Sequence, residues 1–373
     1  MQTNHLQAIH LMNFKCFEDQ KVSLAPITLL TGLNGMGKST VLQSLLLLRQ
    51  SAMRNVLEHY GLLLNGDLVN LGRAGDVLFE GARDEHIVLE LTVGGMQESW
   101  KFRYEDPHAD VLMLEEGPKV LPEWVVFGNR FHYLAAERMG PREIYEISAY
   151  YVRKLRQLGA DGRFAVAYLE EYGKSLRCLQ GLLHPKTSDS TEENLYSQVN
   201  LWLGEISPGA RLEPISFPDI GKTSLRVSFP SSTKGLMSRP YSTPNVGFGF
   251  SYTLPVLVAV LSSSSGDLVL MENPEAHLHP QGQVALGRLF ALAASGGIQL
   301  IVETHSDHIL NGVRVEVRDG CIASEDVRIH FFQRNQPGGQ HFVESPRVDK
   351  DGRIDNWPEG FFDQTERLLM ELI

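Results

Sequence analysis

Apolar residues in the first hundred positions follow two spacings, one typical of strands and one typical of a helix. Ile27–Thr31 is a compact β-rich run that ends at Gly32, and it predicts a buried strand. The apolar positions after the next glycines recur at helical spacing and predict a helix over Ser39–Ser51. A strand over His86–Val93 ends at two glycines, which favours a hairpin with Trp100–Tyr104 as the partner strand.

The middle of the chain differs from both ends. Glu143–Leu183 is expected to be mostly helical, and Leu212–Pro230 is expected to form strands interrupted by prolines. After residue 240, strands and helices alternate, which favours a largely parallel sheet. The elements expected there are the helix Tyr252–Leu261, the strand Asp267–Met271, the helix Pro280–Ser295 and the strand Gln299–Glu303.

This order of elements predicts an α/β fold in three parts. Residues 1–104 and 241–373 are expected to share one sheet, and residues 105–240 are expected to be an insertion of helices and strands. The sequence has no internal repeat and no sustained heptads.

Composition narrows the classes of function. The chain has 373 residues, 43% of them hydrophobic, which is enough for a sizeable core, and its net charge of −11 argues against a general polyanion binder. The longest apolar run, Leu254–Leu261, is too short to cross a bilayer, and the N-terminal residues lack a signal-peptide pattern. Three scattered cysteines suit a reducing compartment. We therefore expect a cytoplasmic protein with no membrane partner.

A glycine loop follows the first buried strand. Gly32–Ser39 reads GLNGMGKS and fits the phosphate-binding pattern G-x-x-x-x-G-K-[ST]. Glycines allow the loop N–H groups and the following helix N-terminus to surround phosphates. Lys38 is expected at the β- and γ-phosphates and the Ser39 hydroxyl on Mg²⁺, which makes ATP and Mg²⁺ the expected ligands. A Gly-rich turn is the alternative, and the loop alone does not separate kinases, GTPases and motor ATPases.

A second set of polar residues follows the strands near the end of the chain. Glu272 ends one apolar run, Glu275 follows three residues later, and His305 comes just after the next strand. Parallel strands present such groups at their carboxyl edge, where open α/β sheets bind ligands. A zinc site is the weaker alternative, because no cysteine accompanies the histidines that could form it, namely His277, His279, His305 and His308.

In this order, the motifs resemble those of ABC-class P-loop ATPases, in the branch that contains SMC, RecF and OLD-like proteins. The stretches that carry the resemblance are Ile9–Phe17, Gly32–Thr40 (GLNGMGKST), Glu272–Pro280 (ENPEAHLHP), Val302–Asp307 (VETHSD) and the tail 355–362 (DNWPEGFF). The tail is similar to the ending of a bacterial subgroup of uncharacterised ATPases. The resemblance implies a mixed sheet with helices on both faces, in which residues 1–104 and 241–373 are the two halves of the ATPase domain.

The resemblance also implies roles for individual residues. The nucleotide would contact Asn34, Gly35, Gly37, Lys38, Ser39 and Thr40, and the metal would be held by Ser39 and Glu272. His305 matches the histidine that contacts the γ-phosphate. Gly247, Gly249 and Ser251 stand where the family has its signature motif, which completes the nucleotide site of the opposite subunit. A homodimer that forms on ATP binding is therefore expected.

The sequence departs from the family at several points. The signature lacks the Ser-Gly-Gly-Gln form of transporters, the insertion lacks a long coiled coil, and nothing after His305 resembles a TOPRIM nuclease domain. Gln43 and Gln50 lie too early to be the usual Mg²⁺-sensing glutamine. Asn273 stands where most members have a second acid, so Glu275 is the candidate base; a helix N-terminal carboxylate is its structural alternative.

The sequence does not decide what two basic segments bind. Arg138 and Arg142 follow a short apolar strand and would either neutralise phosphate or pair across a subunit interface. A solvated surface position or an internal salt bridge is the alternative. DNA contact, if it occurs, would use a local basic face around Arg153, Lys154 and Arg156 and would weaken steeply with salt.

The function expected from the sequence is an ATPase whose ATP-dependent dimerisation controls nucleic acid or an effector protein, such as a nuclease or toxin, in genome maintenance or antiphage defence. The alternative is a slow nucleotide sensor or scaffold that binds a protein partner. The ATP-binding subunit of a transporter is disfavoured by the SMC-like opening and the atypical signature.

The Lys38→Ala variant should lose ATP binding or hydrolysis, because it removes the mobile cation at the β- and γ-phosphates, where phosphoryl charge develops. Equilibrium ATP binding and steady-state hydrolysis measure this loss. Wild-type affinity and turnover in the variant would refute the assignment of the loop.

Overall fold

The computed structural model describes the chain as two compact units. The residues described are 5–231, 233, 236–336, 339–362 and 364–372, so the ends of the expected parts at residues 1–4 and 373 lie outside them. Unit 1 consists of Met1–Phe131, Ser324–Asp349 and Arg353–Ile373, and unit 2 consists of His132–Ala323 and Lys350–Gly352. The three-part division at residues 104 and 240 stays a prediction.

Unit 1 contains a six-stranded antiparallel sheet in the order β2-β1-β5-β6-β7-β4. Alternate residues of β5 are buried, as expected for a strand with one covered face. The expected hairpin is present, because β5 pairs with β6 across Gly94 and Gly95, both at positive φ. The strands are β1 (Leu6–Phe14), β2 (Phe17–Ser23), β4 (Gly61–Leu63), β5 (His86–Val93), β6 (Met96–Arg103) and β7 (Val111–Glu116).

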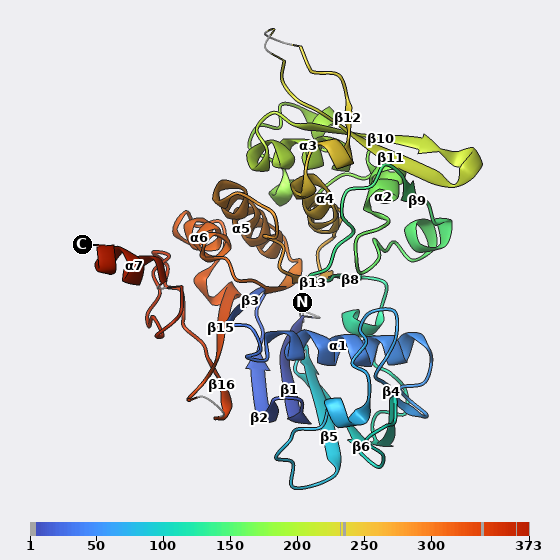
Figure 1. Ribbon diagram of the computed structural model, residues 1–373, viewed down its shortest axis with the longest axis vertical. Helices are drawn as coiled ribbons and strands as arrows, with labels where there is room; N and C mark the ends of the chain where they lie inside the picture. Colours follow the sequence, from blue (N-terminus) through green and yellow to red (C-terminus); the bar gives the residue numbers. More distant parts are fainter. Residues whose placement is uncertain (1–4, 232, 234–235, 337–338, 363, 373) are drawn as a thin grey trace. The chain divides into compact units, whose positions relative to one another are not determined.

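A second group of strands in unit 1 joins the two ends of the chain. Strand β3 (Ile27–Gly32) is buried up to Thr31 and runs parallel to β15 (Val327–Arg334), which pairs antiparallel with β16 (His341–Glu344). Helix α1 (Lys38–Met53) follows β3 and packs against β1, β3 and β4 (Figure 1). The predicted order of strand, glycine loop and helix is confirmed.

The C-terminal tail of unit 1 packs on β15. Phe361 is 0% exposed, and its ring lies edge-on to Phe331, with the centroids 5.3 Å apart. The Trp357 ring also lies edge-on to Phe361, with the centroids 5.1 Å apart, and helix α7 (Gln364–Leu372) follows. The aromatic residues of the tail therefore cover β15 with apolar surface.

Unit 2 contains the parallel strands β13 (Leu268–Glu272) and β14 (Gln299–Glu303), with β8 (Phe131–Leu134) next to β13. The helices around them are α4 (Phe248–Leu261), α5 (Pro280–Ser295) and α6 (Asp307–Arg318). Helices α5 and α6 pack closely (Figure 1), because Gly287 and Gly312 face each other and a Cβ on either would meet backbone atoms of the other helix. The four elements expected between residues 252 and 303 are confirmed, with α4 starting four residues earlier.

The rest of unit 2 forms a smaller antiparallel sheet with two helices. Of the two prolines expected to break these strands, Pro218 starts the turn between β10 and β11, whereas Pro214 lies inside β10 and pairs with Leu225 of β11. The elements are β9 (Tyr145–Glu146), α2 (Ala165–Tyr172), α3 (Leu195–Ile206), β10 (Arg211–Phe217), β11 (Lys222–Ser228) and β12 (Tyr241–Ser242). No helix within the described residues is both long and apolar enough to cross a membrane.

One expectation about this region is wrong. Glu143–Leu183 is not mostly helical: it holds a five-residue π-helix (Tyr150–Lys154), the short α2 and a long irregular stretch. Gly159 and Gly162 have φ of 78° and 73°, which a continuous helix does not allow. A Cβ on Gly162 would also lie 2.5 Å from Cγ of Pro255 in α4. The apolar residues of this region are therefore buried by packing against other parts of unit 2, and they do not need a continuous helix for this.

The Phe361→Ala variant should lower the free energy of unfolding by about 3–5 kcal/mol, the usual cost of truncating a fully buried phenylalanine. Thermal or urea unfolding measures the loss, and Leu369→Ala on the exposed face of α7 should change it by less than about 0.5 kcal/mol. Equal stability of the two variants would mean that the tail does not stabilise β15.

Candidate functional site

The glycine loop of unit 1 lies between β3 and α1. Gly35 and Gly37 have φ of 76° and 103°, a conformation that favours glycine. A Cβ on Gly37 would lie 2.6 Å from Phe17 Cζ and 2.7 Å from Cys16 Sγ, whereas a Cβ on Gly35 would meet nothing within 4 Å. One face of the loop is therefore packed against the β1–β2 turn, and the other is open.

The side chains that the motif assigns to phosphate and metal lie on this loop and at the start of α1. Lys38 is 3% exposed, and its ammonium donates to the carbonyl oxygens of Gly32 and Leu33, both at 2.9 Å. Asn34 is exposed, Ser39 is half-buried at the first turn of α1, and Thr40 is buried. Backbone N–H groups at a helix N-terminus together with a lysine form the environment that binds phosphate.

Both early glutamines are hydrogen-bonded within unit 1. Gln43 accepts a hydrogen bond of 2.7 Å from Lys15 Nζ. Gln50 donates to the Leu63 carbonyl at 2.9 Å and accepts from the Val69 N–H at 3.1 Å. Both side chains therefore connect α1 to neighbouring segments of unit 1.

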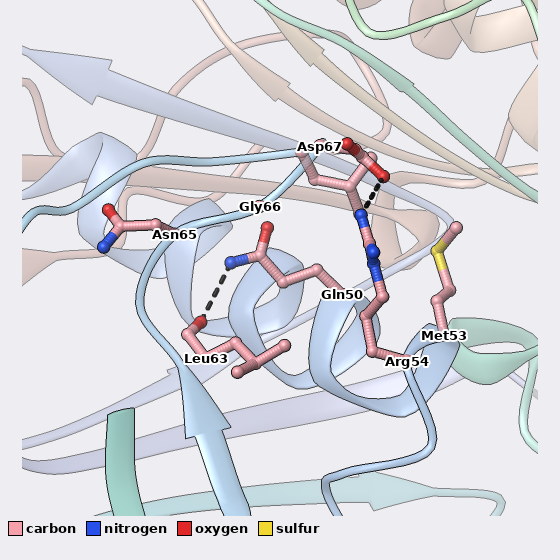
Figure 2. Close-up of a pocket in the computed structure, with 8 residues that line it drawn as sticks. Gln50, Met53, Arg54, Leu63, Asn65, Gly66 and Asp67 are labelled. Carbon is pink, nitrogen blue, oxygen red and sulfur yellow. Dashed lines mark hydrogen bonds and ion pairs between the residues drawn. The ribbon is translucent and has the colours of Figure 1, made fainter. Parts of the chain in front are cut away.

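Gln50 also lines a cavity of about 280 Å³ at the C-terminal end of α1 (Figure 2). Arg54 and Asp67 at its rim form an exposed ion pair of 3.0 Å. A helix rises about 1.5 Å per residue, so this cavity lies many ångströms along α1 from Lys38. It is separate from the phosphate-binding end of the helix.

In unit 2, Glu272 ends β13 and is held at both carboxylate oxygens. The Tyr133 hydroxyl donates to Oε1 at 2.9 Å, and the Ala136 N–H reaches Oε2 at 3.3 Å. Burial and the Glu272 carboxylate raise the pKa of Tyr133 well above its ordinary value, so the phenol stays a donor. The parallel register places Glu303 directly beside Glu272, and this second acid was not among the predicted site residues.

The oxygen donors fit the expected metal. Mg²⁺ prefers hard oxygen ligands and takes only one or two from protein beside phosphates and water. The Ser39 hydroxyl is one oxygen donor and the Glu272 carboxylate is another, and their joint binding of one Mg²⁺ stays a prediction. A bound Mg²⁺ would neutralise phosphate charge.

Arg138 lies inside unit 2, behind the turn that follows Glu272. Nη1 donates to the Glu272 carbonyl at 2.8 Å and to the Ala135 carbonyl at 3.0 Å, and Nη2 donates to the Asn273 carbonyl at 2.6 Å. Burial lowers the pKa of Arg138 to about 10, and the carboxylates of Glu275 and Glu272 oppose this effect. Arg138 is therefore an internal residue, and its hydrogen-bond partners are backbone carbonyls.

Glu275 contacts the loop after β14. Its Oε1 accepts the His305 backbone N–H at 2.7 Å, and Oε2 is buried with no hydrogen-bond partner among the described residues. Burial raises the pKa of Glu275, although the hydrogen bonds from His305 and Thr304 oppose the shift. The structure thus brings Glu275 and His305 together through the His305 backbone. The His305 side chain is exposed.

The glycines of the signature segment lie at the N-terminus of α4. Gly247 is the N-cap, with φ of 87°, and Gly249 is in the first turn, where a Cβ would lie 3.2 Å from the His277 carbonyl oxygen. Free N–H groups at such a terminus favour an anion. Ser251, the third residue assigned to this segment, is buried: it is 5% exposed, and its Oγ lies 3.5 Å from the Tyr145 hydroxyl.

The four histidines considered for zinc have other contacts. The His277 ring packs against Phe248 and Tyr252, with centroids 5.3 and 4.6 Å apart. His279 is the N-cap of α5 and accepts from the Gln281 N–H at 3.4 Å. Within the described part of the chain, no group of three or more potential metal-binding side chains is found.

The basic segment proposed for DNA lies at the π-helix. Arg153, Lys154 and Arg156 are all exposed. Arg153 pairs with Glu171 at 2.9 Å, and the Arg156 guanidinium lies 5.2 Å from the Tyr172 ring centroid. Two of the three cations therefore already have partners within unit 2.

Comparison with known proteins agrees with these motifs. Residues 5–90 match the family described as "AAA ATPase domain", residues 209–311 match "AAA domain, putative AbiEii toxin, Type IV TA system", and residues 322–372 match "Protein of unknown function (DUF3696)". No curated protein matches the sequence. The matches support the resemblance to ABC-type P-loop ATPases that the motifs indicated.

The fold is that of SMC head domains. The Pyrococcus furiosus SMC head with an extended coiled coil, bound to the C-terminal domain of ScpA, aligns with a TM-score of 0.53 at 13% identity and covers 99% of each chain. An SMC head bound to the C-winged helix domain of ScpA aligns with a TM-score of 0.52 at 13% identity, covering 93% of this chain and 98% of that one. The expected fold class is confirmed.

Glu275→Gln should reduce ATP hydrolysis by about 10²–10⁴-fold if Glu275 is the base, while ATP stays bound. Because the pKa of Glu275 is raised, the wild-type rate should fall on acidification at a higher pH than an ordinary glutamate gives, and this limb should be missing in the variant. Steady-state rates across pH measure both effects.

Asn273→Glu is the companion variant, and it should speed hydrolysis because it supplies an acid directly after Glu272. If Glu275→Gln turns over like the wild type, Glu275 is structural and holds only the His305 loop.

Proposed function

We propose that the protein is an ATP-dependent switch: it binds ATP with Mg²⁺, closes into a homodimer, hydrolyses ATP slowly and thereby controls a partner. The observation that carries the proposal is the complete glycine loop between a buried strand and a helix, with the Lys38 ammonium turned onto the loop. The AAA ATPase matches and the SMC-head fold support the same class.

Gly35 and Gly37 would have different roles when the loop binds ATP. The open face at Gly35 leaves room for a phosphate against the backbone N–H groups, while Gly37 keeps the loop packed on Phe17. Lys38 would exchange its two carbonyl partners for phosphate oxygens, and Ser39 would face Mg²⁺. The cost of removing Lys38 from carbonyls is small, because charge-assisted hydrogen bonds to phosphate are the stronger ones.

Slow turnover follows from the acids at the end of β13. The Asn273 amide cannot accept a proton, so proton removal from water falls to Glu275, with His305 nearby. Glu275 already uses one oxygen for the His305 N–H, and burial raises its pKa. Its carboxylate would have to turn from the His305 loop toward the attacking water before it could act, and this step favours a long-lived ATP-bound state.

The dimer is supported by the N-terminus of α4. Gly247, Phe248 and Gly249 present a helix N-terminus that is not fully buried, and the glycines permit close approach by phosphate. We assign Gly247 and Gly249 to the nucleotide of the opposite subunit. Ser251 would join them only after its hydroxyl leaves Tyr145.

The partner is proposed to be an effector protein, such as a nuclease or toxin, in the cytoplasm. Similar SMC heads have been solved with ScpA bound, and one matching family is described with a toxin of a toxin–antitoxin system. DNA is a second proposed partner, through the exposed cations of the π-helix. A nucleotide sensor that scaffolds a protein partner is the alternative, and the amide at Asn273 in place of a second acid favours it.

Dimerisation provides the test. In a Glu275→Gln background, ATP should convert the monomer to a dimer in sedimentation or light scattering, and Gly249→Asp should abolish this change because a carboxylate at the α4 N-terminus repels phosphate. ATP binding to the monomer should persist. The matched control is Gly204→Asp in α3, where a Cβ meets nothing within 4 Å. A monomer with and without ATP in the parent protein would contradict the dimer.

A further inference from the structure

Arg138 is a buried cation of unit 2 that the proposed mechanism leaves without a role. Its side chain is 2% exposed, and its two terminal nitrogens donate to three backbone carbonyls. Burying a guanidinium is costly unless its hydrogen bonds are made, and an apolar residue of similar size would often be as stable. Stability alone therefore does not account for an arginine at this position.

The carbonyls that Arg138 binds belong to the residues that place the acids. Those of Glu272 and Asn273 lie at the turn where the chain leaves β13, and Asn273 has φ of 45°, an unusual conformation for a side-chain-bearing residue. The same short segment supplies Tyr133 and the Ala136 N–H to the Glu272 carboxylate. Residues 133–138 thus fix both the backbone and the side chain of Glu272.

The turn is also packed against the first turns of α4. The Arg138 guanidinium lies 5.3 Å from the Tyr252 ring centroid, and the His277 ring lies against Tyr252 and Phe248. A Cβ on Gly140 would lie 3.2 Å from the Phe248 ring, so the segment after Arg138 touches α4 as well. These contacts all lie inside unit 2.

We propose that Arg138 is a positioning residue that holds the Glu272–Asn273 turn against the N-terminus of α4, so that the acids and the signature glycines move as one body. The proposal rests on the proposed function, in which those glycines meet the nucleotide of the opposite subunit. Engagement of α4 by that nucleotide then sets the position of Glu272 and Glu275 in the same subunit. Arginine suits this task because its planar fork holds its three carbonyl partners in a fixed geometry, whereas a lysine ammonium is a point charge on a flexible stem.

Arg138→Lys keeps the charge but loses the fork, and it is the first test. The kcat for ATP should fall about 10–100-fold, because misplacement by about 1 Å costs that much, while ATP affinity measured with a fluorescent analogue should stay within about twofold. ATP-dependent dimerisation should persist. Tyr133→Phe should lower kcat less and raise the Mg²⁺ concentration at half-maximal rate, because Glu272 Oε1 loses its donor.

Hydrogen exchange gives a readout that does not depend on hydrolysis. In Arg138→Lys, exchange should rise together in residues 248–252 and 272–279, and it should be unchanged in the glycine loop 32–40. Arg177→Lys and Tyr150→Phe are matched controls at exposed positions of unit 2, and both should behave like the wild type.

The outcomes separate the two proposals. If the wild type neither binds nor hydrolyses ATP, the proposed function fails, while joint exchange at 248–252 and 272–279 still supports the single body. If Arg138→Lys turns over like the wild type, or if exchange rises only at residues 135–138, Arg138 does not position the acids. Should Arg138→Lys fail to fold, Tyr133→Phe and Tyr252→Leu decide: wild-type kcat in both overturns the proposal.

Discussion

The hydrogen bonds of one buried guanidinium constrain the part of unit 2 that carries the candidate acids. A cation inside a protein must find acceptors, and the nearest acceptors for Arg138 are the carbonyls at the end of β13. These bonds fix where the chain turns after Glu272, and this turn decides where Glu275 and His277 lie. The contact of Glu275 with the His305 loop and the contact of His277 with α4 both depend on it.

Local signals in the sequence were sufficient for the elements on which the motifs lie. The β3–loop–α1 unit has a buried run, glycines and helical spacing in direct succession, and β13, α5 and β14 have the same local clarity. In Glu143–Leu183 the local signals conflicted: the spacing of the apolar residues favoured a helix, whereas Gly159 and Gly162 did not. Tertiary contacts such as Gly162 with Pro255 settle such a region, and a single sequence does not contain them.

The residues of the candidate site also divide into those with a local signal in the sequence and those without one. Lys38, Ser39 and Glu272 could be proposed as site residues because their chemistry is tied to fixed spacing within a motif. Tyr133 and Arg138 lie more than 130 residues from the acid they hold, so no local pattern connects them to it. An apolar strand followed by arginine was the only signal, and it fitted a surface residue equally well. The burial of Ser251 behind Tyr145 was likewise invisible, since 106 residues separate the two hydroxyls.

Asn273 makes the residues after β13 different from those expected in a fast ATPase. An amide after Glu272 cannot act as a base, yet its N–H and carbonyl bind Glu303 and Arg138, so the residue contributes to holding the turn. Glu275, the candidate base, is tied to the His305 backbone, and burial raises its pKa. In the proposed function the acids are held in place, but Glu275 must leave the His305 loop before it can take a proton from water. Such a protein would spend most of its cycle in the ATP-bound state, as a timer or switch requires and a motor does not.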